Sequence, residues 1–314
     1  MTVIDLKTMR EVSSPSASVL CLGNFDGVHA GHMALIREAI QKKAVLSAKY
    51  GDVVSGACFF RTPPSDYMLA SPIPQLTTFE QKLELFAHCG LDYAFVMDFS
   101  EIGGLSPADF VNSVLKQDFH CVYAVCGYNF HFGKSAAGDA TLLDTLMKGE
   151  LSVIAPVLVD GNIVSSSAIR QKIADGEMHL IPPLLGRPYC IQAEVLHGKA
   201  LGRTIGIPTV NQYFPGNLAV PKLGIYITQT AVNGKERPSV TNVGIRPSVD
   251  DGTRVNCETH ILDFDGDLYG QCVTVRFIKR LRDEIRFESL DALKEQIQRD
   301  ITTTREYGKE APVL

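Results

Sequence analysis

The sequence predicts two domains: an N-terminal α/β domain with a parallel sheet and a C-terminal antiparallel β-barrel with a terminal helix. Its 314 residues exceed the usual size of one hydrophobic core, so two cores are expected. The first half alternates short apolar runs with amphipathic stretches, whereas the second half alternates apolar and polar residues one by one. The pattern changes after Ile181-Pro182-Pro183, so we place the domains at residues 1–183 and 184–314.

The first domain has the pattern of successive βα units. Amphipathic helices are predicted at residues 32–50, 78–89 and 107–117. They separate apolar runs of strand length, at residues 19–22, 53–60, 94–97, 121–126 and 153–156. Helical crossovers join parallel strands, and the ligands of such sheets collect at the carboxyl ends of the strands.

The second domain has the pattern of a small barrel. Half-buried antiparallel strands are predicted at residues 190–195, 224–232, 255–262 and 271–278. Asn233-Gly234 predicts a hairpin turn, because both residues tolerate positive φ. Apolar residues at helical spacing predict a terminal helix over residues 290–305.

Composition limits the classes of partner. The formal net charge of -5 and the lack of a basic patch disfavour nucleic acid and anionic membranes as partners. No run approaches the ~20 apolar residues of a membrane span, and the eight cysteines form no C-x-x-C pair. We expect a cytoplasmic protein that is a monomer or a weak homo-oligomer.

The first candidate site follows the predicted strand at residues 19–22. His29 and His32 lie three residues apart, which places both imidazoles on one face of a first helical turn. Such a helix N-terminus is an anion site, and Gly23, Gly27 and Gly31 permit close approach of the backbone to a phosphate. Two surface histidines are the plain alternative, and no neighbouring ligands complete a zinc site.

The whole string from Gly23 to His32, G-N-F-D-G-V-H-A-G-H, resembles the opening motif of the bacterial bifunctional riboflavin kinase/FMN adenylyltransferases. H-x-G-H alone resembles the wider nucleotidylyltransferase superfamily, whose domain is Rossmann-like. The resemblance implies that His29 and His32 are catalytic. It also implies a set of ATP-binding residues in the same string: Gly23, Phe25, Asp26, Gly27 and Gly31.

Two further stretches resemble this family. Residues 127–133, G-Y-N-F-H-F-G, look like the loop whose Asn or Asp lies in the nucleotide and flavin pocket, here Asn129. In residues 164–170, V-S-S-S-A-I-R, the resemblance implies that Ser165, Ser166 and Arg170 hold ATP phosphates, although such serines commonly cap helices. The pattern departs at Pro63, where the family has a histidine near the phosphates.

The second candidate site is the string H-G-K-A-L-G-R-T-I-G-I-P-T-V-N at residues 197–211. Its glycines can turn backbone N–H groups toward phosphates, its cations can neutralise charge, and Thr209 and Asn211 offer oxygen ligands for Mg²⁺. A solvated hairpin is the alternative. The string resembles the riboflavin kinase signature, which implies these ATP-binding residues: Gly198, Lys199, Gly202, Arg203, Gly206 and Pro208.

The resemblance also assigns residues downstream. Residues 256–270 are similar to the stretch that carries the catalytic base of the kinase, here Glu258, which would take a proton from a primary alcohol. Residues 281–287 look like the flavin-facing loop before the last helix, which implies flavin contacts by Arg282 and Glu284 in addition to Asn129.

The resemblance covers nearly the whole chain and implies two reactions. Riboflavin would be phosphorylated to FMN by ATP with Mg²⁺, and FMN would be adenylylated to FAD with release of pyrophosphate. Three alternatives stay open: a monofunctional riboflavin kinase with an impaired adenylyltransferase domain, a nucleotidylyltransferase for another phosphate ester, and a flavin-responsive binding or regulatory protein that contacts RNA.

Overall fold

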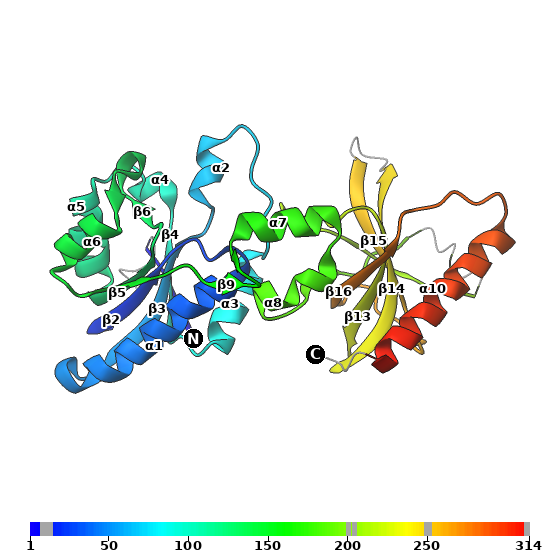
Figure 1. The fold of residues 1–314 in the computed structure, drawn as a ribbon, viewed down its shortest axis with the longest axis horizontal. Coiled ribbons are helices and arrows are strands. Elements are labelled where there is room, and N and C mark those ends of the chain that lie inside the picture. Colours follow the sequence, from blue (N-terminus) through cyan, green and yellow to red (C-terminus); the bar gives the residue numbers. More distant parts are fainter. Residues whose placement is uncertain (7–14, 199–201, 203–205, 248–252, 311–314) are drawn as a thin grey trace. The chain divides into compact units, whose positions relative to one another are not determined.

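The fold was analysed on a computed structural model that describes residues 1–6, 15–198, 202, 206–247 and 253–310. The chain divides into two compact units, residues 1–166 and 167–314, each of which is described by itself (Figure 1). The first is the predicted parallel α/β fold and the second is the predicted antiparallel barrel with a terminal helix, so the fold class is confirmed.

The first unit is built on a six-stranded parallel sheet in the order β1-β4-β3-β2-β5-β8. Its strands are β1 (Thr2–Asp5), β2 (Ala17–Leu22), β3 (Val53–Phe60), β4 (Tyr93–Met97), β5 (Cys121–Gly127) and β8 (Leu151–Ile154). The order reverses between β2 and β5, so the loops that leave these strands flank the crevice where such sheets bind ligands.

Helices cover both faces of this sheet. The main helices are α1 (Ala30–Tyr50), α3 (Phe79–His88), α6 (Ala140–Met147) and the π-type helix η3 (Phe110–Asp118). Along β2, Val19 and Cys21 pack with α1 and α3, whereas Leu20 and Leu22 pack with η3 and α6. Burial on both faces explains why the parallel strands are continuous apolar runs.

Shorter elements complete the first unit. They are α2 (Pro64–Met68), α4 (Phe99–Ile102), α5 (Pro107–Asp109), the 3₁₀ turns η2 (Asp26–Val28) and η4 (Lys134–Ala136), and the strand pairs β6 (His131–Phe132) with β7 (Gly138–Asp139) and β9 (Leu158–Val159) with β10 (Asn162–Ile163).

A helical segment opens the second unit: α7 (Ser166–Asp175), η5 (Met178–Leu180) and α8 (Pro182–Leu185). Lys222 donates its backbone N–H to Ile173 O of α7 at 3.2 Å, which ties this segment to the barrel. The compact units thus divide after Ser166, the first residue of α7, whereas the boundary proposed from sequence, 183/184, falls within α8.

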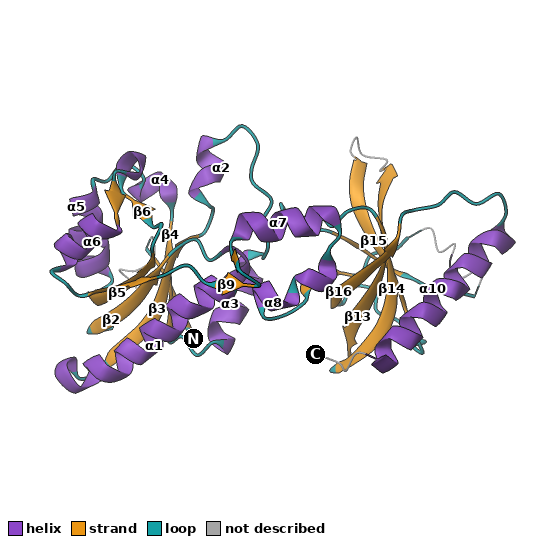
Figure 2. Ribbon diagram, viewed as in Figure 1, coloured by secondary structure: helices purple, strands orange, loops and turns teal. Residues whose placement is uncertain are grey.

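The second unit is a six-stranded antiparallel sheet in the order β11-β16-β13-β14-β15-β12. Strands β13, β14, β15 and β16 are labelled in Figure 2. Its strands are β11 (Tyr189–Glu194), β12 (Val210–Tyr213), β13 (Gly224–Val232), β14 (Lys235–Pro247), β15 (Thr253–Ile261) and β16 (Cys272–Arg282). An antiparallel bridge between Leu196 and Asn211 brings the two edges together, so the barrel is nearly closed. Helix α10 (Leu290–Glu310) packs Ile297 and Ile301 onto the barrel.

Several element bounds differ from those predicted. The predicted helix at residues 107–117 is split into α5 and η3, and the strand predicted at 153–156 ends at Ile154. Strand β1 was not predicted, because its four residues pair only along β4 at the sheet edge. Helix α10 continues past Arg305 to Glu310.

The hairpin turn at Asn233-Gly234 is confirmed. Both residues have positive φ, 52° and 71°, between β13 and β14. Positive φ at both central residues matches the twist of a two-residue hairpin.

We expect Gly234→Ala to destabilise the second unit by about 1 kcal/mol, because an L side chain is strained at this φ. Gly308 provides the matched control, since it lies in α10 with open space around its Cβ position and no positive φ. Gly308→Ala is expected to stabilise by about 0.5–1 kcal/mol. Urea unfolding of both variants measures these changes, and equal effects would contradict the assigned turn.

Candidate active sites

The loop between β2 and α1 is held in an unusual conformation. Phe25, Gly27 and Val28 have φ values of 51°, 82° and 43°. Positive φ at a non-glycine residue costs on the order of 1–3 kcal/mol and persists only where the surroundings enforce it. Phe25 is fully buried and its ring packs edge-on against Phe86. The strain therefore lies in a tightly packed loop at the carboxyl end of β2.

His29 and His32 stack at the start of α1. Their ring centroids are 3.7 Å apart with an interplanar angle of 16°. His29 is the N-cap, and its Nδ1 accepts the backbone N–H of His32 at 3.4 Å. A Cβ on Gly31 would lie 3.0 Å from the His29 ring, so the glycine leaves room for that ring. Both predicted histidines thus lie together at a helix N-terminus, where anions bind.

Burial controls the charge of this site. It lowers the pKa of His32 well below its usual 6.5, with further lowering by His29 and Lys82. His32 Nδ1 is buried and has no hydrogen-bond partner among the described residues. Burial also lowers the pKa of Lys82 to about 8, against the opposing effect of Asp26. His32 is therefore a neutral imidazole at pH 7.

Asp26 and Ser166 fix the loop in place. Asp26 Oδ1 accepts the backbone N–H of Leu76 at 2.7 Å, and Gly27 N–H donates to Thr77 Oγ1 at 3.3 Å. Ser166 Oγ donates to the carbonyl oxygen of Asp26 at 2.9 Å. These contacts join three segments distant in sequence around the strained turn.

The other predicted residues of this site lie in neighbouring segments. Asn129 is exposed after β5, and Pro63 follows β3, so both come from strands that flank β2. Ser165 is half-buried directly before α7. Arg170 lies on α7 in the second unit, where its Nη1 donates to Ser167 Oγ at 3.4 Å, so its role at the histidines stays a prediction.

Cross-strand pairing forms the second site. Asn211 of β12 is the register partner of Glu258 of β15. Asn256 Nδ2 donates to Glu258 Oε1 at 2.9 Å and to Asn211 Oδ1 at 3.4 Å. Thr209 lies directly before β12 and lines the neighbouring cavity. The barrel thus brings Asn211, one of the two predicted oxygen ligands, together with the predicted base.

Close packing explains two glycines of the second motif. A Cβ on Gly198 would lie 2.5 Å from Asn211 Nδ2, and one on Gly202 would lie 2.2 Å from the carbonyl oxygen of Ile207. Position 206 requires glycine for a different reason, because its φ is 77°. Lys199 and Arg203 lie outside the described residues.

A cavity of about 650 Å³ lies beside this motif. Its lining includes His197, Pro208, Thr209, Asp267 and Tyr269, and the rings of His197 and Tyr269 stack at 3.8 Å. This volume is in the range of pockets for drug-sized ligands. Both residues lie in stretches that the sequence analysis assigned to the kinase, but their stacking was not predicted, because the two rings are far apart along the chain.

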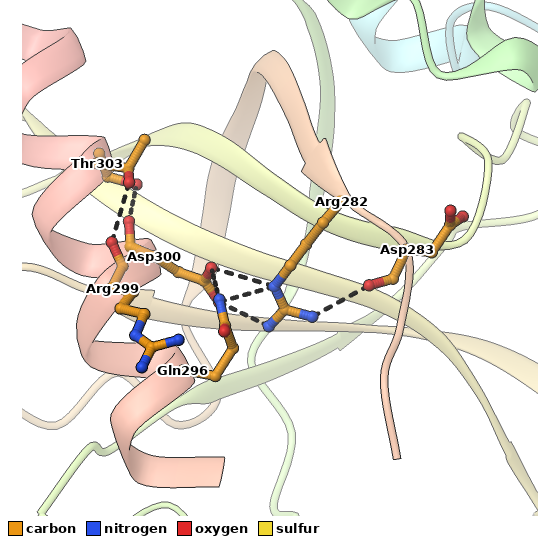
Figure 3. Close-up of polar contacts among 7 residues, drawn as sticks. Arg282, Asp283, Gln296, Arg299, Asp300 and Thr303 are labelled. Carbon is orange, nitrogen blue, oxygen red and sulfur yellow. Dashed lines mark hydrogen bonds and ion pairs between the residues drawn. The ribbon is translucent and has the colours of Figure 1, made fainter. Parts of the chain in front are cut away.

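Arg282 is engaged by the terminal helix (Figure 3). Its Nη2 and Nε donate to the Asp300 carboxylate at 2.6 to 3.2 Å, and its Nη1 donates to Asp283 O at 3.0 Å. Gln296 Nε2 adds a bond to Asp300 Oδ1 at 3.0 Å. Glu284 Oε1 would lie 2.5 Å from a Cβ on Gly244, so its carboxylate lies over β14. The flavin contacts proposed for Arg282 and Glu284 stay predictions.

The fold and the two family matches that follow define a two-domain enzyme of nucleotidyl and phosphoryl transfer. Residues 11–168 match the FAD synthetase family model, and residues 185–308 match the riboflavin kinase model. The chain therefore belongs to the bifunctional riboflavin kinase/FMN adenylyltransferase family. The helical segment from 169 to 184 lies between the two matches.

Curated relatives of that name cover most of the chain. The Escherichia coli (strain K12) protein is 36% identical over 92% of both chains, and the Pseudomonas fluorescens protein is 33% identical over 91% of this chain and 92% of the relative. The Bacillus subtilis (strain 168) protein is 30% identical over 90% of each. Both units are therefore shared with these relatives.

A solved structure shares the whole fold. The crystal structure of a macrolide-efflux protein from Streptococcus pneumoniae superposes with a TM-score of 0.86 and is 29% identical, covering 97% of this chain and 99% of that one. Within the described residues, no helix of the present chain has the length and apolar character needed to cross a membrane.

The neutral state of His32 predicts a pH-dependent stability. Its folded pKa lies below its unfolded pKa of 6.5, so the stabilisation is present above pH 6.5 and is lost as the pH falls below it. At pH 5 we expect a loss of up to about 2 kcal/mol relative to pH 7. Urea unfolding of the first unit at several pH values, compared with His32→Leu, measures this loss. Identical pH slopes for both proteins would contradict the assignment.

The pairing of Arg282 with Asp300 predicts a large stability effect. Asp300 is 5% exposed, so Asp300→Ala leaves a desolvated cation and is expected to cost about 3–5 kcal/mol in urea unfolding. The apolar double variant Arg282→Met/Asp300→Leu should recover most of that loss. The exposed Arg299–Glu295 pair of the same helix is the control, where Glu295→Ala is expected to cost less than about 1 kcal/mol. Equal losses at the two pairs would argue against the buried ion pair.

Proposed function

We propose that the protein makes flavin cofactors in two steps, with the barrel phosphorylating riboflavin to FMN and the α/β unit adenylylating FMN to FAD. The observation that carries the proposal is the hydrogen-bonded cluster of Asn211, Asn256 and Glu258, within the stretch that matches riboflavin kinase. The 650 Å³ cavity of the same barrel is lined by Thr209 and not by these three residues. ATP is the co-substrate of both steps.

In the kinase step, Glu258 accepts the proton of the ribityl 5′-hydroxyl as that oxygen attacks the γ-phosphorus of ATP. The γ-phosphoryl group passes to riboflavin, and ADP leaves. The nucleotide occupies the cavity lined by His197 and Tyr269. Gly198 and Gly202 let the backbone lie against Asn211 and Thr209.

The donors at Thr209 and Asn211 fit Mg²⁺. A hydroxyl and a carboxamide oxygen are hard ligands, and Mg²⁺ in kinases takes few protein ligands with phosphates and water for the rest. When bound with ATP, Mg²⁺ neutralises charge on the phosphates. Asn256 Nδ2 fixes the carboxamide oxygen of Asn211, which prepares it for this use.

In the adenylylation step, a phosphate oxygen of FMN attacks the α-phosphorus of ATP, and pyrophosphate leaves. His29 and neutral His32 hold phosphate oxygens at the N-terminus of α1, where the helix dipole also favours negative charge. Asn129, Ser165 and Ser166 belong to the proposed pocket of the first unit, and the family resemblance also assigns ATP phosphates to Arg170. This reaction needs positioning and charge stabilisation and no protein nucleophile.

The cellular setting follows from the same proposal. We place the enzyme in the cytoplasm as a monomer or a weak homo-oligomer that binds riboflavin, FMN, FAD and ATP. The net charge of -5 favours neither a nucleic acid nor an anionic membrane as a partner. The domain limits 1–183 and 184–314 keep α7 and η5 with the adenylyltransferase.

Purified protein with riboflavin, ATP and Mg²⁺ is expected to form FMN and then FAD, as followed by chromatography. Glu258→Gln should lower FMN formation by about 10²–10⁴-fold, because the general base is lost, while FMN added directly is still converted to FAD. His32→Gln should instead lower the conversion of FMN to FAD and leave FMN formation unchanged.

Each alternative has its own outcome in this assay. FMN that accumulates without FAD supports the monofunctional kinase, in line with Pro63 at the position of the family histidine. Flavin binding without any product supports a regulatory protein. Loss of both activities in folded Glu258→Gln would contradict separate sites.

A further inference from the structure

Asn256 lies at the centre of the kinase site and opens the stretch 256–270, although the resemblance assigned a role there only to Glu258. It is 2% exposed, and its side-chain nitrogen reaches both Glu258 and Asn211, on two different strands. It lies two residues before Glu258 on β15, so the two side chains project from the same face of the sheet. One carboxamide therefore links the proposed base and the proposed metal ligand.

The other end of this carboxamide is unsatisfied. Asn256 Oδ1 is buried and has no hydrogen-bond partner among the described residues. A buried acceptor without a partner costs stability, whereas an apolar side chain of similar size at the same position does not. The acceptor end of Asn256 therefore adds no stability, and the two bonds that Nδ2 donates are what distinguish this side chain from an apolar one.

We propose that Asn256 is a positioning residue for the riboflavin kinase reaction, which orients the carboxylate of Glu258 toward the substrate hydroxyl. The inference rests on the proposed function of Glu258 as the base. A carboxylate on a strand rotates about its side-chain torsions, and a donor 2.9 Å from Oε1 limits that rotation. A base displaced by about 1 Å can lose about 100-fold in rate.

A matched pair of variants tests the hydrogen bond. Asn256→Val and Asn256→Thr have nearly the same shape, and only threonine keeps a donor. We expect Asn256→Val to lower the kinase kcat by about tenfold to 100-fold, with KM for riboflavin and ATP unchanged within about twofold. Asn256→Thr should recover part of this loss. The melting temperature should stay within about 2 °C for both variants, because the loss of the bonds donated by Nδ2 is offset by removal of the buried, unpartnered Oδ1.

A double-mutant cycle tests whether Asn256 acts through Glu258. In a Glu258→Gln background, Asn256→Val is expected to lower the residual kcat by less than about threefold, because orientation no longer matters once the base is gone. Asn242 provides the control. It is the register partner of Glu258 on β14 and also has a buried, unpartnered Oδ1. No side-chain hydrogen bond joins it to Glu258 among the described contacts. Asn242→Val should change kcat by the same factor in both backgrounds.

The outcomes separate this inference from the proposed function. FMN adenylylation by the same molecules is the internal standard for the amount of active protein, and the melting temperature reports whether the barrel of each variant is folded. If the unaltered protein forms no FMN, or Glu258→Gln remains fully active, the proposed function fails and the inference fails with it. If Glu258→Gln is impaired but Asn256→Val has full kcat, equals Asn256→Thr, loses stability, or acts additively with Glu258→Gln, only the role of Asn256 is overturned.

Discussion

The register between β12 and β15 is the constraint on which the kinase site depends. Four residue pairs define it, and one of them sets Asn211 opposite Glu258. Because side chains alternate along a strand, a slip of one residue would turn Glu258 into the barrel and Thr259 out of it. Interior hydroxyls oppose that slip, since Thr259 Oγ1 bonds Thr241 Oγ1 at 2.9 Å and Thr241 bonds Thr228 at 2.7 Å. A buried chain of threonines thus fixes the position of the half-buried Glu258 carboxylate on the opposite face of β15.

The histidines of the adenylyltransferase half are positioned by packing. Strand pairing cannot position them, because they follow the sheet instead of lying in it. Packing holds them: the strained turn at Phe25 and Val28, the buried Lys82 that donates to Asn24 O at 2.9 Å, and the N-cap bond of His29. Desolvation of these groups keeps His32 neutral, so the same burial that fixes the geometry also sets the charge.

The sequence predicts what local chemistry determines. Continuous apolar strands, the Asn233-Gly234 turn and the glycine motifs each carry their own signal, and all are present in the fold. The sequence does not predict contacts that only the tertiary structure creates. The sequence shows Asn256 as a polar residue of a strand, and only the strand register shows that its side chain bonds both Asn211 and Glu258. Arg282 was assigned to flavin from its loop, but its partner Asp300 lies 18 residues away on α10 and carries no motif.

The central claim is that each half of the chain has its own ATP site. One site transfers the γ-phosphoryl group of ATP, and the other transfers the adenylyl group through attack at the α-phosphorus. The most direct measurement follows two labels in parallel reactions that start from riboflavin, one with ATP labelled at the γ-phosphate and one with ATP labelled at the α-phosphate. We expect FMN to contain only the γ-label and FAD to contain one phosphate from each source. FMN that carries the α-label, or FAD without the γ-label, would contradict two separate sites.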